Sequence, residues 1–244
     1  MNKKPILTTG LSLLTLLLSA CGVNVVQGSG HVVTETRQVS DFTRVELLGS
    51  GEVVLTQGDE EALQVEAEDN LLGHIRTEVQ GHTLYLGLRN GEIPEILQPT
   101  RPIKYYVSLK AVEGLAVSGS GDISAGNVTA DSLDLSINGS GNISIDTLAA
   151  KTLKSTIRGS GKCEVRGGTA SDQAVDISGS GNYAGGKLEG ETGSVQITGS
   201  GAATVRVKAA LEARISGSGD VYYYGTPRVT EHITGSGNIQ AKGG

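Results

Sequence analysis

Several residues in this chain have types and spacings that could do chemistry. The segment Gly159-Ser160-Gly161-Lys162-Cys163 resembles the end of a phosphate-binding loop. That loop needs another glycine five residues before the one that precedes its lysine, and a Ser or Thr after the lysine. Thr156 and Cys163 occupy those two places. The sequence therefore argues against a nucleotide site here.

Serines recur between glycines, but they lack the Gly-x-Ser-x-Gly context of a hydrolase nucleophile, and no histidine recurs beside them. A calcium-binding roll would need Asp at a fixed place in successive turns. The column that follows each glycine-serine-glycine triplet is broken by a lysine and an alanine: it reads His31, Glu52, Asp122, Asn142, Lys162, Asn182, Ala202, Asp220 and Asn238. We interpret these residues as a solvated face or as turn formers, and we predict no catalytic residue, metal site or cofactor.

Cys163 occupies a column otherwise filled by Ile, Val, Ala and Tyr, so we interpret it as a small buried hydrophobe and not as a reactive thiol. The histidines His31, His74, His82 and His232 show no metal-ligand spacing. We expect them to be isolated surface residues.

The best candidate for recognition is the run Tyr222-Tyr223-Tyr224, with Tyr183 two repeats earlier. Strand alternation turns Val221 and Tyr223 inward and leaves Tyr222 and Tyr224 outward. There their aromatic faces could stack on a glycan or a protein. The simpler alternative is one bulky ring that fills the end of the core beside two exposed tyrosines.

These residues are positioned by a repeat. Gly-Ser-Gly occurs nine times, and from the third copy on the starts lie 20, 20, 20, 20, 18 and 18 residues apart. The residue two before each triplet is always a branched aliphatic: Val26, Leu47, Val117, Ile137, Ile157, Ile177, Ile197, Ile215 and Ile233. Two places after the triplet an inward column resumes, from Val32 and Val53 to Val221 and Ile239.

Each unit reads as strand, triplet, strand and polar connection, which is too short for a crossover helix. The period predicts an all-β fold, a parallel β-helix (β-solenoid) with coils of about 18–20 residues. Glycine on both sides of serine suits a corner that needs positive φ or close approach of the next coil. Residues 113–244 form the regular repeat, and we expect residues 28–112 to form irregular N-terminal coils that cap it.

The first twenty residues have the layout of a secretory signal, because Lys3 and Lys4 precede an apolar run from Ile6 to Leu18. Leu18-Ser19-Ala20-Cys21 resembles the lipobox of bacterial lipoproteins, which implies a lipoprotein signal peptide at 1–20, acylation of Cys21 and a tether over 21–27. Gly22 follows the cysteine where enteric inner-membrane retention signals have Asp, which favours the outer membrane. Multiple acyl chains such as palmitate give firm anchoring.

Composition limits the partners. Without Lys3 and Lys4 the chain has 18 basic and 26 acidic residues, a formal net charge of −8. We therefore expect no nucleic-acid partner. The exposed last coil is an unpaired edge, so we expect homo-oligomers through it.

A further pattern runs through the first part of the chain and into the later triplets: Gly28-Ser29-Gly30 through Arg37, Val39, Phe42 and Val45, then Gly49-Ser50-Gly51 with Val53 and Leu55, then Val65, Ala67 and Asn70-Leu71. This pattern resembles the DUF2807 family. That family is also called the "putative autotransporter adhesin, head GIN domain" family. The resemblance spans about residues 28–241 and implies a β-helical protein that faces the cell surface or periplasm. It supplies no catalytic residues.

These observations predict a non-enzymatic, lipid-anchored lipoprotein of the bacterial cell envelope, which acts as an adhesin-like binding or structural module with a glycan or protein ligand. The alternative is a polysaccharide lyase or hydrolase, since many secreted β-helices act on sugars. That chemistry needs a paired acid and base or a carboxylate cluster on one face. We find no such cluster in the sequence.

Overall fold

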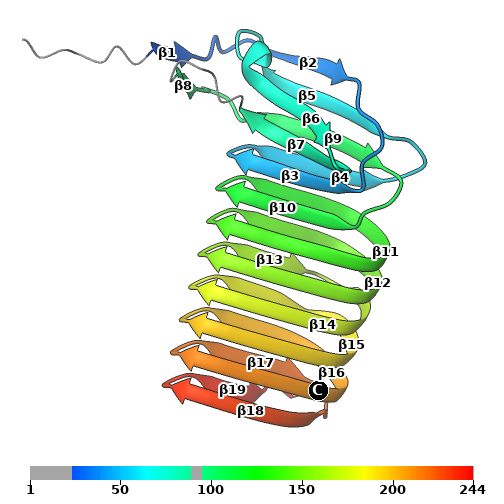
Figure 1. The fold of residues 1–244 in the computed structure, drawn as a ribbon, viewed down its shortest axis with the longest axis vertical. Helices are drawn as coiled ribbons and strands as arrows, with labels where there is room; N and C mark the ends of the chain where they lie inside the picture. The colour runs from blue at the N-terminus through cyan, green and yellow to red at the C-terminus, as the bar shows by residue number, and fades with distance from the viewer. Residues whose placement is uncertain (1–23, 89–94, 244) are drawn as a thin grey trace, which may run out of the picture.

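The computed structural model describes residues 24–88 and 95–243, and strands dominate it (Figure 1). Cys21 and the proposed signal lie outside these residues. The strands of the regular repeat are β10 (Gly114–Gly119), β11 (Asp122–Gly139), β12 (Asn142–Gly159), β13 (Lys162–Val165), β14 (Gly168–Gly179), β15 (Asn182–Gly199), β16 (Ala202–Gly217), β17 (Asp220–Tyr224), β18 (Arg228–Gly235) and β19 (Asn238–Ala241).

The predicted parallel β-solenoid is confirmed. β11 pairs in parallel with β12 from Asp122↔Asn142 to Gly139↔Gly159, so one coil advances the chain by one repeat. Figure 1 shows these coils stacked one above the next. The apolar column before the triplets fills the interior, since Ile137, Ile157 and Ile177 are each at most 1% exposed.

One feature of the coil differs from the sequence prediction. The segment from Asp146 to Lys151, predicted to be a polar connection, belongs to the continuous bent strand β12 and pairs with its neighbours. The strict alternation is interrupted in it, because Asp146 and Thr147 are both exposed, but Leu148 is fully buried and packs in the core. Extended backbone here lets β11 and β12 pair along most of their length.

The triplet glycines have the geometry that the sequence predicts. Gly159 has φ +126°, and a Cβ atom on it would overlap the carbonyl oxygen of Gly139 in the preceding coil. Ser160 N donates to that same oxygen at 2.9 Å. Positive φ and close approach therefore both require glycine at this corner.

The first part of the chain is built differently from the coils. Its elements are β1 (Asn24–Gln27), β2 (Val32–Arg37), β3 (Arg44–Gly49), β4 (Glu52–Gln57), β5 (Ala62–Glu68), the 3-10 helix η1 (Leu72–His74), β6 (Ile75–Gln80), β7 (Thr83–Leu88), β8 (Glu95–Gln98) and β9 (Lys104–Leu109). β3 and β4 join the solenoid by pairing with β10 and β11. Three pairs are antiparallel, β2 with β5, β5 with β9, and β6 with β7.

The first triplet is not part of the stack, which corrects the alignment of nine equivalent copies. The Gly49 triplet stacks directly on the Gly119 triplet, as β3 pairs with β10. Gly28-Ser29-Gly30 instead follows β1, which pairs with β8 beyond the N-terminal end of the stacked coils (Figure 1). Val32, predicted to point inward, is 40% exposed. The reason is that Gly30 N donates to the Glu68 carboxylate at 2.6 Å, which holds this triplet against β5.

Candidate functional site

The tyrosine run lies on β17, where Tyr223 and Tyr224 pair with Val205 and Arg206 of β16. Val221 is buried and Tyr223 packs against the core, while Tyr222 and Tyr224 lie on the outer surface and are half-buried. The predicted alternation is confirmed. Tyr183, grouped with this run in the sequence, is only 2% exposed and belongs to the core. It therefore cannot contribute to a surface patch.

Each of the two outward tyrosine rings makes a cation–π contact with a basic side chain of a neighbouring segment. The Arg206 guanidinium lies 4.7 Å from the centroid of the Tyr224 ring. Lys242 Nζ lies 4.0 Å from the centroid of the Tyr222 ring. Contacts of this kind contribute ~0.5–1 kcal/mol at exposed sites. They fix the two rings and place positive charge beside each of them.

Tyr224 lines a surface groove of about 540 Å³. The groove crosses β13, β15, β16 and β17 and is lined by Glu164, Val165, Arg166, Ala184, Gly186, Lys187, Thr204, Arg206 and Tyr224. Its volume lies in the range of small-ligand sites, roughly 300–1,000 Å³.

The groove exists because one side chain is missing from an outward column. Glu164, Ala184, Thr204 and Tyr222 are paired in register across four coils. Two residues further along the chain come Arg166, Gly186, Arg206 and Tyr224. Arg206 Nε donates to the Gly186 carbonyl at 2.9 Å. A Cβ on Gly186 would sit 3.0 Å from both the Tyr224 ring and the Thr204 methyl, so glycine leaves room for the ring and opens the hollow.

The groove is positively charged although the chain as a whole is acidic. Its one carboxylate, Glu164, is bound by Lys162 at 2.8 Å and by Arg166 at 3.1 Å. The hydrogen bond from Lys162 is the main cause that lowers the pKa of Glu164. Within the described part of the chain, Lys187 and Arg206 have no ion-pair partner. The arrangement suits an anion that also offers a surface to Tyr224.

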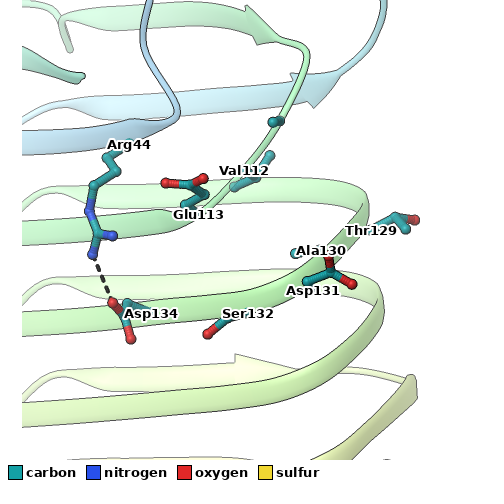
Figure 2. Close-up of a pocket in the computed structure, with 9 residues that line it drawn as sticks. Arg44, Val112, Glu113, Thr129, Ala130, Asp131, Ser132 and Asp134 are labelled. Atoms are coloured by element: carbon teal, nitrogen blue, oxygen red, sulfur yellow. Dashed lines mark hydrogen bonds and ion pairs between the residues drawn. The ribbon is translucent and has the colours of Figure 1, made fainter.

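A second cavity, of about 560 Å³, lies where the irregular part meets the first regular coils (Figure 2). Its charged groups already have partners. Arg44 Nη2 binds Asp134 Oδ2 at 2.9 Å, and Thr43 Oγ1 donates to Glu113 at 3.0 Å. Lys151 binds Asp131 at 2.7 Å and lowers the pKa of that carboxyl. The Arg44–Asp134 pair ties β3 to β11, and the Lys151–Asp131 pair joins β12 to β11.

The other candidate residues have structural roles. Lys162, next to the apparent phosphate loop, is directed to Glu164. Asn142 Nδ2 donates to Asp122 Oδ1 at 2.7 Å, so the column after the triplets bridges successive coils. In residues 24–88 and 95–243, no three His, Cys, Asp or Glu side chains gather in a way that could hold a metal.

Cys163 is completely buried, and desolvation raises the pKa of its thiol to about 12. The interpretation of Cys163 as a small buried hydrophobe is confirmed. A thiol with such a pKa holds almost no thiolate at neutral pH and is a poor nucleophile.

No pattern in the sequence indicates the buried carboxylate of Glu68, which is 1% exposed. Its side chain accepts hydrogen bonds from Thr100 Oγ1 at 2.5 Å, Thr100 N at 2.8 Å and Gly30 N at 2.6 Å. These bonds, led by the Thr100 hydroxyl, lower the pKa of Glu68. The donors lie 32 and 38 residues away along the chain, beyond the reach of any local pattern. Their position indicates that Glu68 joins three segments of the irregular part.

Comparison with solved structures gives several neighbours. One is described as a putative adhesin from Bacteroides fragilis NCTC 9343, with 25% identity and a TM-score of 0.82, over 88% of this chain and 99% of the other. A second, described as a putative lipid binding protein from Parabacteroides distasonis ATCC 8503, has 25% identity and a TM-score of 0.75 over 89% and 99%. A third, a putative adhesin from the same strain, has 23% identity and a TM-score of 0.71 over 89% and 100%.

None of the helices in the described residues is long and apolar enough to span a membrane. No curated protein gives a significant match to the chain. One family model does match, over residues 41–227, and its description is "Putative auto-transporter adhesin, head GIN domain". The expected resemblance is thus confirmed over most of its predicted span, and the chain belongs to the DUF2807 family.

Proposed function

We propose that this protein is a non-enzymatic, adhesin-like binding module of the bacterial cell envelope. The observation that carries the proposal is the groove beside Tyr224, a hollow of about 540 Å³ lined by a fixed aromatic ring and by two cations, Lys187 and Arg206, that have no ion-pair partner among the described residues. The names of the family and of two similar structures, which describe adhesins, point the same way.

The alternative, a polysaccharide lyase or hydrolase, has weaker support. Glycoside hydrolysis needs one carboxyl group kept protonated and a second one that is ionised. In the groove the only carboxyl group is Glu164, whose pKa is lowered by Lys162. In the second cavity, Asp131 has a lowered pKa and Asp134 is bound to Arg44. Neither Glu164 nor Asp131 suits the role of general acid, because the pKa of each carboxyl group is lowered.

We further propose that Cys21 carries the membrane anchor and that the anchor lies in the outer membrane. Expression of the full chain in a Gram-negative host with radiolabelled palmitate tests this directly. We expect label in the outer-membrane fraction, and loss of the label in Cys21→Ala. Equal labelling of the variant would contradict the assignment.

The binding role is tested with cells that display the chain on the outside and with surfaces coated with glycans or envelope proteins. We expect attachment to at least one coating, with no product released from the polysaccharides. Turnover of a polysaccharide that is lost in Glu164→Gln would instead support the enzyme.

A further inference from the structure

We infer that the groove beside Tyr224 binds an acidic saccharide, with the ring carboxylate between Arg206 and Lys187 and the sugar ring against Tyr224. This inference rests on the proposed binding function and names its ligand class. We call the site, lined by Arg166, Gly186, Lys187, Arg206 and Tyr224, the Tyr224 groove.

Arg206 is prepared to receive a carboxylate. Its Nε atom donates to Gly186 O at 2.9 Å, and its guanidinium lies over the Tyr224 ring. Among the described contacts its two terminal nitrogens have no acceptor. An arginine held flat by a ring offers a planar pair of N–H donors, which matches the two oxygens of a carboxylate. Little side-chain entropy is left to lose on binding.

The charges around Arg206 favour an anion of limited charge. Lys187 on β15 also lines the groove and is exposed, and the groove's own carboxylate, Glu164, is neutralised by Lys162 and Arg166. Glu189, the residue paired with Arg206 across the strands, is bound by Lys208 at 3.1 Å. The whole chain has a formal net charge of −6, which repels a nucleic acid or another dense polyanion over longer distances. A short saccharide with one carboxylate per ring meets both conditions.

The apolar surface favours a saccharide over a lipid bilayer. Membrane-surface binding needs apolar side chains that can enter the bilayer beside the basic ones. The large exposed hydrophobic residues of the described chain are Val25, Val32, Val54, Tyr106 and Ile233, and none of them lines the groove. Tyr224, whose ring spans the missing side chain at Gly186, offers instead a surface for the C–H groups of a sugar.

Isothermal titration calorimetry of the full chain with a galacturonate trisaccharide tests the inference. The methyl ester of the same trisaccharide is the control ligand, because it keeps the rings and removes the charge. We expect the acid to bind at least tenfold more tightly than the ester, and more weakly at high salt. Arg206→Gln should weaken binding of the acid about tenfold, and Lys187→Gln severalfold.

Arg214→Gln is the matched control variant. Arg214 is also on β16, is exposed and binds Glu212, and lies outside the groove. It should bind the acid as the wild type does. Ala184→Leu narrows the groove without changing its charge, and should also weaken binding. It keeps the test decisive if Arg206→Gln fails to fold.

Equal binding of the acid and the ester would overturn the inference that Arg206 and Lys187 bind a carboxylate. The protein would then bind a glycan without recognising its charge. Binding of phosphatidylglycerol vesicles that depends on Arg206, without binding of the trisaccharide, would overturn the inference in favour of a lipid headgroup. Failure to bind the trisaccharide while the displayed chain still attaches to another coating would refute the ligand class alone. Failure to attach to any coating would refute the binding function itself.

Discussion

Replacing one triplet glycine with alanine should destabilise the whole solenoid. In Gly159→Ala, a non-glycine residue must adopt φ +126°, which costs ~1–3 kcal/mol. The new methyl also meets the Gly139 carbonyl oxygen, so the two coils must separate locally, at a cost of ~1–3 kcal/mol. Together these effects lower the free energy of unfolding by about 4 kcal/mol. For a chain of this size the melting temperature should fall by roughly 12 °C.

Urea unfolding followed by circular dichroism measures this change, with Ser160→Ala as the control. Ser160 belongs to the same corner, but its side chain is exposed and only its backbone N–H bonds to Gly139. We expect the control to change stability by less than about 0.5 kcal/mol. If Gly159→Ala is as stable as Ser160→Ala, the close approach of the coils does not limit this position, and the reasoning is wrong.

Three further predictions concern Glu68 and Cys163, which are buried, and Ile233, which is exposed. The folded-state pKa of Glu68 lies below its unfolded value of about 4.3, so its stabilising effect is present above that pH and is lost as pH falls through the folded-state pKa. Acid should therefore lower the urea midpoint less in Glu68→Gln than in the wild type. An equal fall of the urea midpoint with pH in both proteins would contradict this. Cys163 should not react with a thiol reagent in a Cys21→Ala background until urea unfolds the chain, and rapid labelling of the native protein would show that the thiol is accessible. Ile233 in the last coil is 42% exposed, so light scattering should detect self-association that Ile233→Lys weakens, whereas a monomer at high concentration would argue against the proposed edge contact.

The regular coils could be predicted because their signal repeats. Ile137, Ile157 and Ile177 occupy one column at a fixed interval, and a single interval sets both the register and the core. The irregular part has no such interval. Val32 pairs with Glu68 in an antiparallel ladder, so its inward or outward direction depends on a partner far along the chain. This is why repeat spacing alone wrongly aligns the first triplet with the others.

Only part of the candidate site could be predicted from the sequence, because only the inward columns of the repeat were compared from coil to coil. Alternation predicts that Tyr222 and Tyr224 point outward. Arg206, which places a positive charge beside Tyr224, lies one coil earlier, so its contact with that ring can be predicted only when the outward columns are aligned as well as the inward ones. By repeat spacing Arg166, Gly186, Arg206 and Tyr224 occupy one place in successive units, which marks both the charge and the missing side chain. That signal is present in the sequence. In the structure the strand register shifts after Ala184, so that Arg206 pairs with Glu189. The bonds at Glu68 have no comparable periodic signal.

The central claim is that recognition occurs in the Tyr224 groove, while the triplets only maintain the coil. Attachment of cells that display the full chain to a galacturonate-coated surface tests it, with the variant that combines Arg206→Gln and Tyr224→Ala compared with Arg214→Gln at equal surface levels. We predict that the groove variant loses most of its attachment and that Arg214→Gln keeps it. Undiminished attachment of the groove variant would contradict the claim.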